Sequence, residues 1–193
     1  MSQLVFLGPP GAGKGTQAKF LAEEKGLLHL STGDMFRNAI AKGTPTGVQA
    51  KSYMDQGQLV PDSVVDALVV ERLKEDDARG GYLLDGYPRN LSQAEALDGV
   101  LAEHGTKLDG VLFLDVPDDV LIARIVKRGE ESGGARADDT EEVARERLVV
   151  YREHTEPLVK HYEAAGVLVR LDGTKSIDDV KAAVFAAVEG MSA

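Results

Sequence analysis

A glycine-rich segment close to the N-terminus has the residue types that bind phosphate groups. Residues 8–16 have the sequence GPPGAGKGT, which follows a short apolar run and precedes a helical pattern. Glycines let the backbone turn tightly, so that successive N–H groups and the start of the helix can face one anion. Lys14 adds a positive charge for the β- and γ-phosphates of a nucleotide. Gly15 stands where the P-loop pattern usually has Ser or Thr, and Thr16 follows it. The segment still predicts a nucleotide phosphate site.

Two further polar segments contain arginines that could bind a second phosphate group. Residues 31–37, STGDMFR, and residues 86–89, GYPR, each follow a predicted strand. The carboxyl ends of parallel strands meet at one edge of a sheet, where ligands bind, so Arg37 and Arg89 should lie near the P-loop. Taken alone, Arg37 could equally form a surface ion pair, and Ser31 is expected to cap a helix. The two arginines together favour a ligand site.

The elements that must position these residues alternate between strands and helices. Short apolar runs predict strands at 4–7, 27–30, 82–84, 110–116 and 167–171. Helical patterns lie at 13–25, 34–42, 47–56, 62–75, 90–104, 118–128, 139–165 and 177–188. Pro157 should kink or split the helix predicted at 139–165. Apolar strands separated by helices predict an α/β fold in which a five-stranded parallel sheet is covered by helices on both faces. We expect a single domain over 1–193.

The composition argues against several other classes of protein. The chain has no cysteine, which excludes disulfides and thiolate metal sites, and its four histidines show no zinc-binding spacing. Its net charge of −10 argues against nucleic acids and anionic membranes as partners. No apolar run has the length of a membrane span, and the N-terminus lacks the basic region of a signal peptide. We therefore expect a cytoplasmic protein that binds small molecules.

Several motifs together resemble the adenylate kinase family in their order and spacing over nearly the whole chain. They are GPPGAGKGT, STGDMFR, GQLVPD, DGYPRN followed by Gln93, and RADD followed by RL. The resemblance implies a P-loop core, formed by 1–30, 61–127 and 138–193, with two mobile insertions. A monophosphate-binding segment would occupy 31–60, and a short lid would occupy 128–137. The resemblance also implies a monomer.

The same resemblance implies contacts for each nucleotide. ATP would be bound by Gly11, Ala12, Gly13, Lys14, Gly15, Thr16, Arg124, Arg128 and Lys175. AMP would be bound by Thr32, Arg37, Gln58, Leu59, Val60, Gly86, Tyr87, Pro88, Arg89, Gln93, Arg136 and Arg147. Thr32 and Gln93 favour AMP, because the related pyrimidine monophosphate kinases usually have Ala and Asn at these positions. A UMP/CMP kinase remains the alternative. Family members also resemble one another in a cis Tyr87–Pro88 bond, which we expect here.

The lid departs from that of the longer family members. Only seven residues, 129–135, separate Arg128 from Arg136. Long-lid members have a small β-structured insertion at this place, in some cases with zinc-binding cysteines. We expect a short flexible loop and no zinc.

The implied reaction is the reversible transfer of a phosphoryl group from ATP to AMP, which gives two ADP with no covalent enzyme intermediate. The groups that would neutralise the charge on the transferring phosphate are Lys14, Arg89, Arg128, Arg136 and Arg147. Mg²⁺ would accompany ATP, and Asp85 would orient water bound to it, although Asp85 could instead cap a turn. Asp34 and the pair Asp138–Asp139 are weaker candidates, and the pair could simply cap a helix.

Two other classes of nucleotide-binding protein fit the sequence less well. A GTP-driven switch would need a guanine-reading N-K-x-D element, which is absent from the sequence. A nucleotide sensor without activity could use the P-loop, but it would not need so many arginines.

Overall fold

A parallel β-sheet forms the centre of the protein. The computed structural model describes residues 2–134, 136 and 138–191. The strands are β1 (Gln3–Leu7), β2 (Leu28–Ser31), β3 (Tyr82–Asp85), β4 (Gly110–Asp115) and β5 (Leu168–Asp172). They lie in the order β2-β3-β1-β4-β5, and all neighbouring strands are parallel. The predicted five-stranded parallel sheet is confirmed.

Helices connect the strands and cover the sheet. They are α1 (Lys14–Lys25), α2 (Thr32–Ala41), α3 (Pro45–Asp55), α4 (Asp62–Leu73), α5 (Leu91–Glu103), α6 (Asp118–Glu131), α7 (Glu141–Val150), α8 (Pro157–Ala164) and α9 (Ile177–Met191). A 3₁₀ turn covers Asp76–Gly80. The side chains of Ser31, Thr44, Asn90 and Thr140 cap α2, α3, α5 and α7 by accepting a hydrogen bond from a backbone N–H of the first turn.

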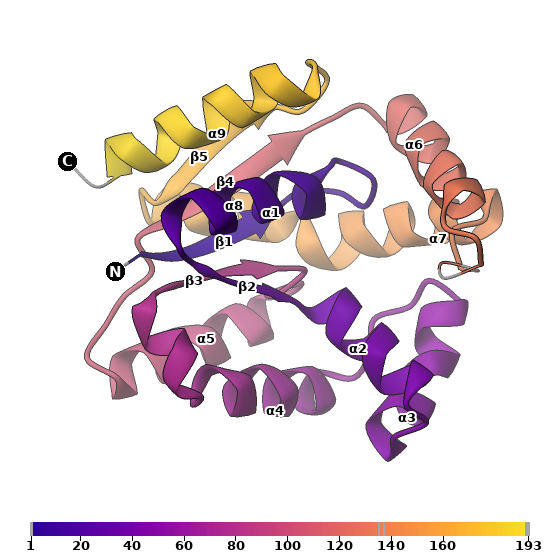
Figure 1. The fold of residues 1–193 in the computed structure, drawn as a ribbon, viewed down its shortest axis with the longest axis horizontal. Coiled ribbons are helices and arrows are strands. Elements are labelled where there is room, and N and C mark those ends of the chain that lie inside the picture. Colours follow the sequence, from indigo (N-terminus) through magenta and orange to yellow (C-terminus); the bar gives the residue numbers. More distant parts are fainter. Residues whose placement is uncertain (1, 135, 137, 192–193) are drawn as a thin grey trace.

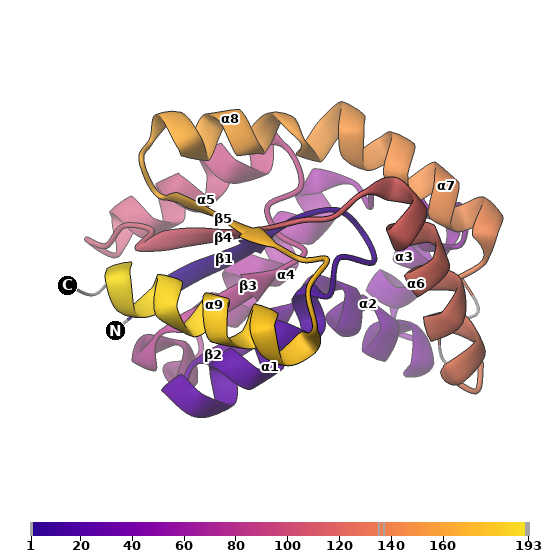
Figure 2. The ribbon, with the colours of Figure 1, turned by 90° about the horizontal axis from the view of Figure 1, so that it is seen from above.

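The alternation of side chains along β1 explains why both faces of the sheet are covered. Val5 and Leu7 face a core that includes apolar residues of α4, α5 and α8. Leu4 and Phe6 face the opposite core, which includes residues of α1 and α9. Figure 2 shows α5 and α8 on one side of the strands and α1 and α9 on the other. A strand buried on both faces forms a continuous apolar run, as residues 4–7 of β1 do.

Two helical stretches can be compared with the sequence-based prediction. The helix predicted at 139–165 is divided by a π-helical segment, Tyr151–Thr155, in which Glu156 N–H donates to the Tyr151 carbonyl at 2.8 Å. Pro157 then starts α8, since proline is tolerated in a first helical turn but not inside a helix. The expected split is therefore confirmed. By contrast, α6 continues to Glu131, so three residues predicted to belong to the lid loop are helical.

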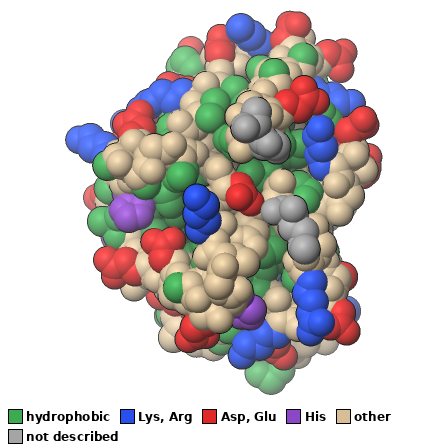
Figure 3. Space-filling view, turned by 90° about the vertical axis from the view of Figure 1, so that its left-hand side faces the viewer, with side chains coloured by type: hydrophobic (Ala, Val, Ile, Leu, Met, Phe, Trp, Pro, Cys, Tyr) green, Lys and Arg blue, Asp and Glu red, His purple; other side chains and the backbone are tan. Residues whose placement is uncertain are grey.

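The strands point toward the end of the molecule at which α2 and α3 lie opposite α6 and α7 (Figure 1). Both chain ends lie at the other end of the sheet, where acidic and basic side chains are interspersed over the surface (Figure 3). Within the described parts of the chain, no helix has the length and apolar character that a membrane span requires. The polar segments that follow β1, β2 and β3 therefore meet at one edge of the sheet.

Candidate active site

The P-loop joins β1 to α1 and encloses the start of that helix. Gly8 has φ 145° and Gly11 has φ 83°, and residues other than glycine rarely adopt such positive φ values. A Cβ on Gly8 would lie 2.8 Å from the Leu114 carbonyl oxygen, and one on Gly11 would lie 2.8 Å from that of Leu121. Both glycines are therefore required by backbone conformation and by close packing. The loop and the first turn of α1 line the cleft, and the start of a helix is a favourable place for an anion.

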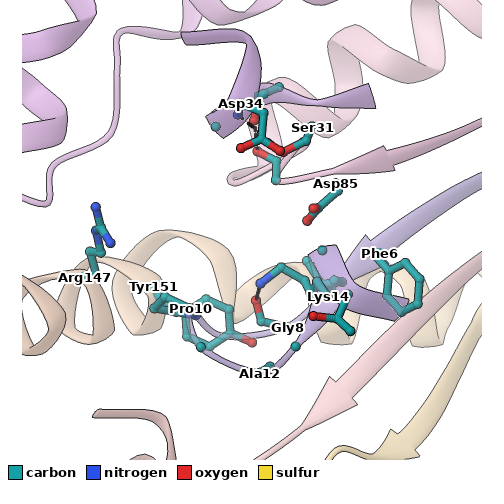
Figure 4. A pocket seen from close by; sticks show the side chains of 18 of the residues that line it. Phe6, Gly8, Pro10, Ala12, Lys14, Ser31, Asp34, Asp85, Arg147 and Tyr151 are labelled. Atoms are coloured by element: carbon teal, nitrogen blue, oxygen red, sulfur yellow. Dashed lines mark hydrogen bonds between the residues drawn. The ribbon is translucent and has the colours of Figure 1, made fainter. Parts of the chain in front are cut away.

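Lys14 is held over the loop. Its Nζ donates to the carbonyl oxygens of Gly8 at 2.7 Å and Pro9 at 2.9 Å, and Figure 4 shows the side chain folded back toward Gly8. Protein atoms surround the ammonium group, although part of the residue is open to the cleft. This burial lowers the pKa of Lys14 from 10.5 to about 8; Asp85 opposes the decrease and Arg89 adds to it. A bound phosphate group would add negative charge next to Lys14 and so stabilise its protonated form.

A cavity of about 890 Å³ extends from the P-loop to α2 on one side and to α7 on the other. Its lining includes six of the eleven arginines of the chain: Arg37, Arg89, Arg124, Arg128, Arg136 and Arg147. Such a concentration of fixed positive charge in a protein of net charge −10 indicates a site for strongly anionic ligands. Its volume is within the range of small-molecule sites.

Arg128 and Arg147 are oriented by one buried carboxylate. Asp139 is only 5% exposed and accepts from Arg128 Nε at 2.6 Å, from Arg128 Nη2 at 2.9 Å and from Arg147 Nη1 at 2.7 Å. Burial alone would raise the pKa of Asp139, but the hydrogen bonds and charge of Arg128 and Arg147 hold it below its usual value. Arg147 also donates to Asp138. The pair Asp138–Asp139 thus positions arginines, whereas the cap of α7 is Thr140.

Arg136 faces α2 across the cleft. Its Nη2 lies 3.5 Å from Asp34 Oδ1, and Arg37 Nη2 donates to the same oxygen at 2.8 Å. Desolvation lowers the pKa of Arg136, and the nearby positive charge of Arg37 adds to this decrease. The carboxylates of Asp138 and Asp139 bind Arg128 and Arg147 instead. Asp34 holds two arginines on the side of the cleft opposite the P-loop.

The loop after β3 forms the wall of the cavity next to α2. The Gly86 carbonyl accepts from Thr32 Oγ1 at 2.9 Å and from Arg89 Nε at 2.8 Å. Arg89 is open to the cleft but surrounded by protein; this desolvation lowers its pKa, and the charge of Arg147 lowers it further. A guanidinium group nevertheless stays protonated at neutral pH. The Tyr87–Pro88 bond is cis, as expected.

The opposite end of the cavity lies between the P-loop and the loop after β5. Arg124 Nη1 donates to the Gly173 carbonyl at 3.0 Å and lies 3.5 Å from that of Ala12. Lys175 is exposed at the same end. Asp85, at the end of β3, lies beside the P-loop: a Cβ on Gly15 would be 3.4 Å from its Oδ2. Figure 4 shows Asp85 between the P-loop and the segment that bears Ser31 and Asp34.

Twenty-one of the twenty-two residues predicted to bind a nucleotide or magnesium line this one cavity, and Tyr87 is the exception. The twenty-one are Gly11, Ala12, Gly13, Lys14, Gly15, Thr16, Thr32, Arg37, Gln58, Leu59, Val60, Asp85, Gly86, Pro88, Arg89, Gln93, Arg124, Arg128, Arg136, Arg147 and Lys175. The Tyr87 side chain is 1% exposed, and its hydroxyl donates to Asp66 at 2.8 Å. Any contact from Tyr87 to a ligand would therefore have to come from its backbone. Gln58 lines the cavity, but its amide also donates to Glu146 of α7.

Sequence reasoning did not predict the role of two carboxylates that hold the site together. Asp62 was not predicted as a site residue and Asp139 was only a weaker candidate, yet each accepts hydrogen bonds from residues predicted to bind a nucleotide. The position of Asp139 between Arg136 and Arg147 in the sequence was the available signal for one of them. Asp62 offered no comparable signal, because its partner Gln93 lies 31 positions away.

Comparison with known proteins gives an independent assignment. The family model described as "Adenylate kinase" matches residues 6–167. A protein named adenylate kinase from Parvibaculum lavamentivorans is 53% identical over 92% of this chain and 87% of its own length. One of the same name from Thermus thermophilus is 51% identical, with 96% of each chain covered. Another from Stenotrophomonas maltophilia is 49% identical over 97% of this chain and 100% of its own length.

The P-loop and the arginines that line the cleft are consistent with the family that these similarities over nearly the whole chain indicate. The chain belongs to the adenylate kinase family.

Proposed function

We propose that this protein catalyses the reversible transfer of the γ-phosphoryl group of ATP to AMP, which gives two ADP. The observation that carries the proposal is the single cavity in which Lys14 and six arginines surround the space between the P-loop and α2. Phosphoryl transfer needs little covalent chemistry from a protein, because catalysis rests on positioning and on neutralising phosphate charge. This arrangement of charges suits that task.

The two ends of the cavity are lined by different residues, so each end can bind a different nucleotide. ATP would lie on the P-loop, with Arg124 and Lys175 at the end near Gly173. AMP would lie against α2, with Thr32 and Gln93 near its base and Arg37 near its phosphate. We propose residues 31–60 and 128–137 as the segments that close over AMP and ATP, respectively. The contact of Arg136 with Asp34 joins these two segments and supports that division.

The chemical step follows from this arrangement. An α-phosphate oxygen of AMP attacks the γ-phosphorus of ATP in line, and the bond from that phosphorus to the oxygen bridging the β- and γ-phosphates breaks. The attacking oxygen is already ionised, so no general base is required. Lys14, Arg89, Arg128, Arg136 and Arg147 would neutralise charge on the transferring group, and one well-placed arginine of this kind is worth on the order of 10³–10⁵ in rate.

The residues beside the P-loop fit magnesium held mainly by the nucleotide. In the described chain, no three His, Asp or Glu residues gather as a metal-binding group. Asp85 is a single carboxylate next to Gly15, and Mg²⁺ commonly takes one or two carboxylates together with substrate phosphates and water. Asp85 would orient water in the first coordination shell. When bound, Mg²⁺ would supply positive charge that offsets the negative charge of the nucleotide phosphates.

Transfer of label tests the direct reaction. With γ-labelled ATP and AMP, we expect label to appear in the β-position of ADP, and Lys14→Met should lose it while the fold is retained. With γ-labelled ATP and no acceptor, the protein itself should carry no label, since a direct transfer has no phosphorylated enzyme. Slow hydrolysis of ATP or GTP without formation of ADP from AMP would indicate a switch or sensor instead. That the enzyme is cytoplasmic and monomeric, without nucleic-acid or membrane partners, stays a prediction that fractionation and light scattering can check.

A further inference from the structure

The oxygen and the nitrogen of the Gln93 side-chain amide form hydrogen bonds to different kinds of group. Its side chain is buried, with the residue only 1% exposed, and it lines the cavity at the end near α2. Nε2 donates to Asp62 Oδ1 at 2.7 Å. Oε1 accepts from the Arg89 backbone N–H at 2.7 Å. One N–H and one oxygen lone pair of the amide remain for a ligand.

These two partners allow only one orientation of the amide. An ionised carboxylate such as Asp62 can only accept a hydrogen bond, and a backbone N–H such as that of Arg89 can only donate one. Rotation of the amide by 180° would place Oε1 against the carboxylate and Nε2 against the N–H group. Both hydrogen bonds would then be lost in a buried place, where an unsatisfied polar group is costly.

Asp62 is itself held in position. It is in the first turn of α4, and its Oδ1 also accepts from Asn90 Nδ2 at 2.9 Å. Asn90 uses its own oxygen to cap α5 by accepting from Gln93 N–H at 2.9 Å. The start of α4 and the start of α5 are thus joined through one carboxylate, which contacts Gln93 but does not belong to the residues that line the cavity.

The orientation of this amide decides which purines it can pair with. The edge of adenine presents a donor, the 6-amino group, beside an acceptor, N1. A 6-oxopurine presents the reverse: an acceptor, O6, beside a donor, N1–H. An amide complementary to one edge becomes complementary to the other only when its oxygen and nitrogen exchange places.

We propose that Asp62 is a positioning residue that fixes the Gln93 amide and thereby makes the site select a 6-aminopurine monophosphate over a 6-oxopurine monophosphate. The inference rests on the proposed function, in which Gln93 faces the base of AMP. Asp62 does not touch the nucleotide; it acts through Gln93 together with the Arg89 N–H.

Replacing Asp62 with Asn tests the proposal. The Asn amide can donate as well as accept, so it can form a hydrogen bond to Gln93 in either orientation of the Gln93 amide. The Arg89 backbone N–H can still only donate, and it therefore still favours the original orientation. We expect the ratio of kcat/KM for AMP to that for IMP to fall about tenfold, which corresponds to the loss of one charge-assisted hydrogen bond. The dissociation constants of AMP and IMP, measured by calorimetry, should change in the same ratio and need no turnover.

Asp66→Asn is the matched control. Asp66 is one turn further along α4 and accepts from the Tyr87 hydroxyl at 2.8 Å; that hydroxyl also lies 3.2 Å from the Gln93 backbone carbonyl oxygen. The replacement therefore weakens a comparable charge-assisted hydrogen bond to the same loop, but it leaves both partners of the Gln93 side-chain amide in place. This variant should change kcat/KM for AMP and for IMP by the same factor, so that their ratio stays the same. If Asp62→Asn does not fold, Asn90→Ser keeps a capping hydroxyl for α5 and removes only the donor to Asp62; it should lower the ratio by a smaller factor.

An Asp62→Asn variant that loses AMP and IMP activity in parallel, with an unchanged ratio, would overturn the proposal and leave Asp62 a structural role only. A wild-type protein that uses AMP no better than IMP would overturn it as well, because no selectivity would then need explanation. Failure of the wild type to phosphorylate any monophosphate would instead count against the proposed function.

Discussion

Lys14 has a pKa that nucleotide binding should change. Its pKa of about 8 lies below the ordinary value of 10.5 because burial disfavours the charged form. The unfolded chain therefore binds more protons than the folded one between these two values, so this group alone makes stability rise with pH across that window. A bound triphosphate favours the charged form, which returns the pKa of Lys14 upward and couples ATP binding to proton uptake.

We predict from this coupling that ATP affinity weakens above pH 8, with a limiting loss of about tenfold per pH unit for a single proton. Isothermal titration calorimetry in buffers of different ionisation enthalpy measures both the affinity and the uptake of protons. Lys14→Met should bind ATP weakly, with no dependence on pH in this range. Proton uptake that persists in the mutant would assign the effect to another group.

Gln93 should determine how well the site recognises the base. Replacement by Leu removes the amide and leaves the polar edge of the buried adenine unpaired, which should cost about 1–3 kcal/mol of binding. We expect a higher KM for AMP and a smaller gap between AMP and other monophosphates, measured by steady-state kinetics with each. Unchanged selectivity would mean that the shape of the pocket, rather than hydrogen bonding, chooses the base.

At the scale of elements, the junction of α6 and α7 depends on Asp139. Replacement by Asn keeps the shape but weakens the bonds to Arg128 and Arg147. We predict a loss of about 1–3 kcal/mol in the free energy of unfolding, at the lower end because both arginines are partly exposed. The pKa of Asp139 is depressed in the folded state, so its stabilisation is present above the unfolded pKa and is lost as the pH falls through the lower folded pKa.

Urea unfolding of the wild type and of Asp139→Asn at several pH values measures this difference. It should be constant at neutral pH and shrink below about pH 4. Asp77→Asn provides the control, because Asp77 bonds to Arg72 with its side chain 56% exposed and should contribute little. Equal stabilities of the wild type and Asp139→Asn at pH 7 would contradict the role given to Asp139.

The lid should act through Arg136. We propose that closure brings this arginine to the transferring phosphates, and an interaction formed only on closure matters more in the transition state than in ground-state binding. Arg136→Ala should lower kcat and kcat/KM together by at least about a hundredfold, with little change in the dissociation constant of ATP. Arg136→Lys should recover part of the loss, because an ammonium group cannot make the bidentate contact of a guanidinium.

Arg145→Ala is the matched control for that experiment. Arg145 is 64% exposed on α7 and pairs with Glu141 one turn earlier, so its loss should leave kcat within about a factor of two. A similarly small effect of Arg136→Ala would mean that its contact with Asp34 is a surface ion pair.

Sequence alone predicted the strands well because each is a mainly apolar run followed by polar turn residues. The P-loop was predicted equally well, because its backbone conformation requires glycines and these are visible as a pattern in the sequence. Details that depend on distant partners were not predictable. The extension of α6 to Glu131, the contact of Arg136 with Asp34 and the link from Asp62 to Gln93 arise only after the chain folds. A local pattern carries no information on which carboxylate an arginine or amide will meet.

At the scale of the whole molecule, the distribution of charge accounts for the choice of ligand. The net charge is −10, yet Lys14 and six of the eleven arginines line one cleft at the carboxyl edge of the sheet. The face that carries the chain ends has both signs of charge interspersed (Figure 3). A cleft that is positive within an acidic protein attracts small anions such as nucleotides.

A turnover screen tests the central claim most directly. Purified protein is supplied with Mg²⁺, ATP and one monophosphate at a time, AMP, GMP, CMP or UMP, and the diphosphates are separated and counted. The account predicts that AMP is by far the best acceptor and gives two ADP for each ATP consumed. Preferential phosphorylation of UMP or CMP, or consumption of ATP without phosphorylation of any monophosphate, would contradict it.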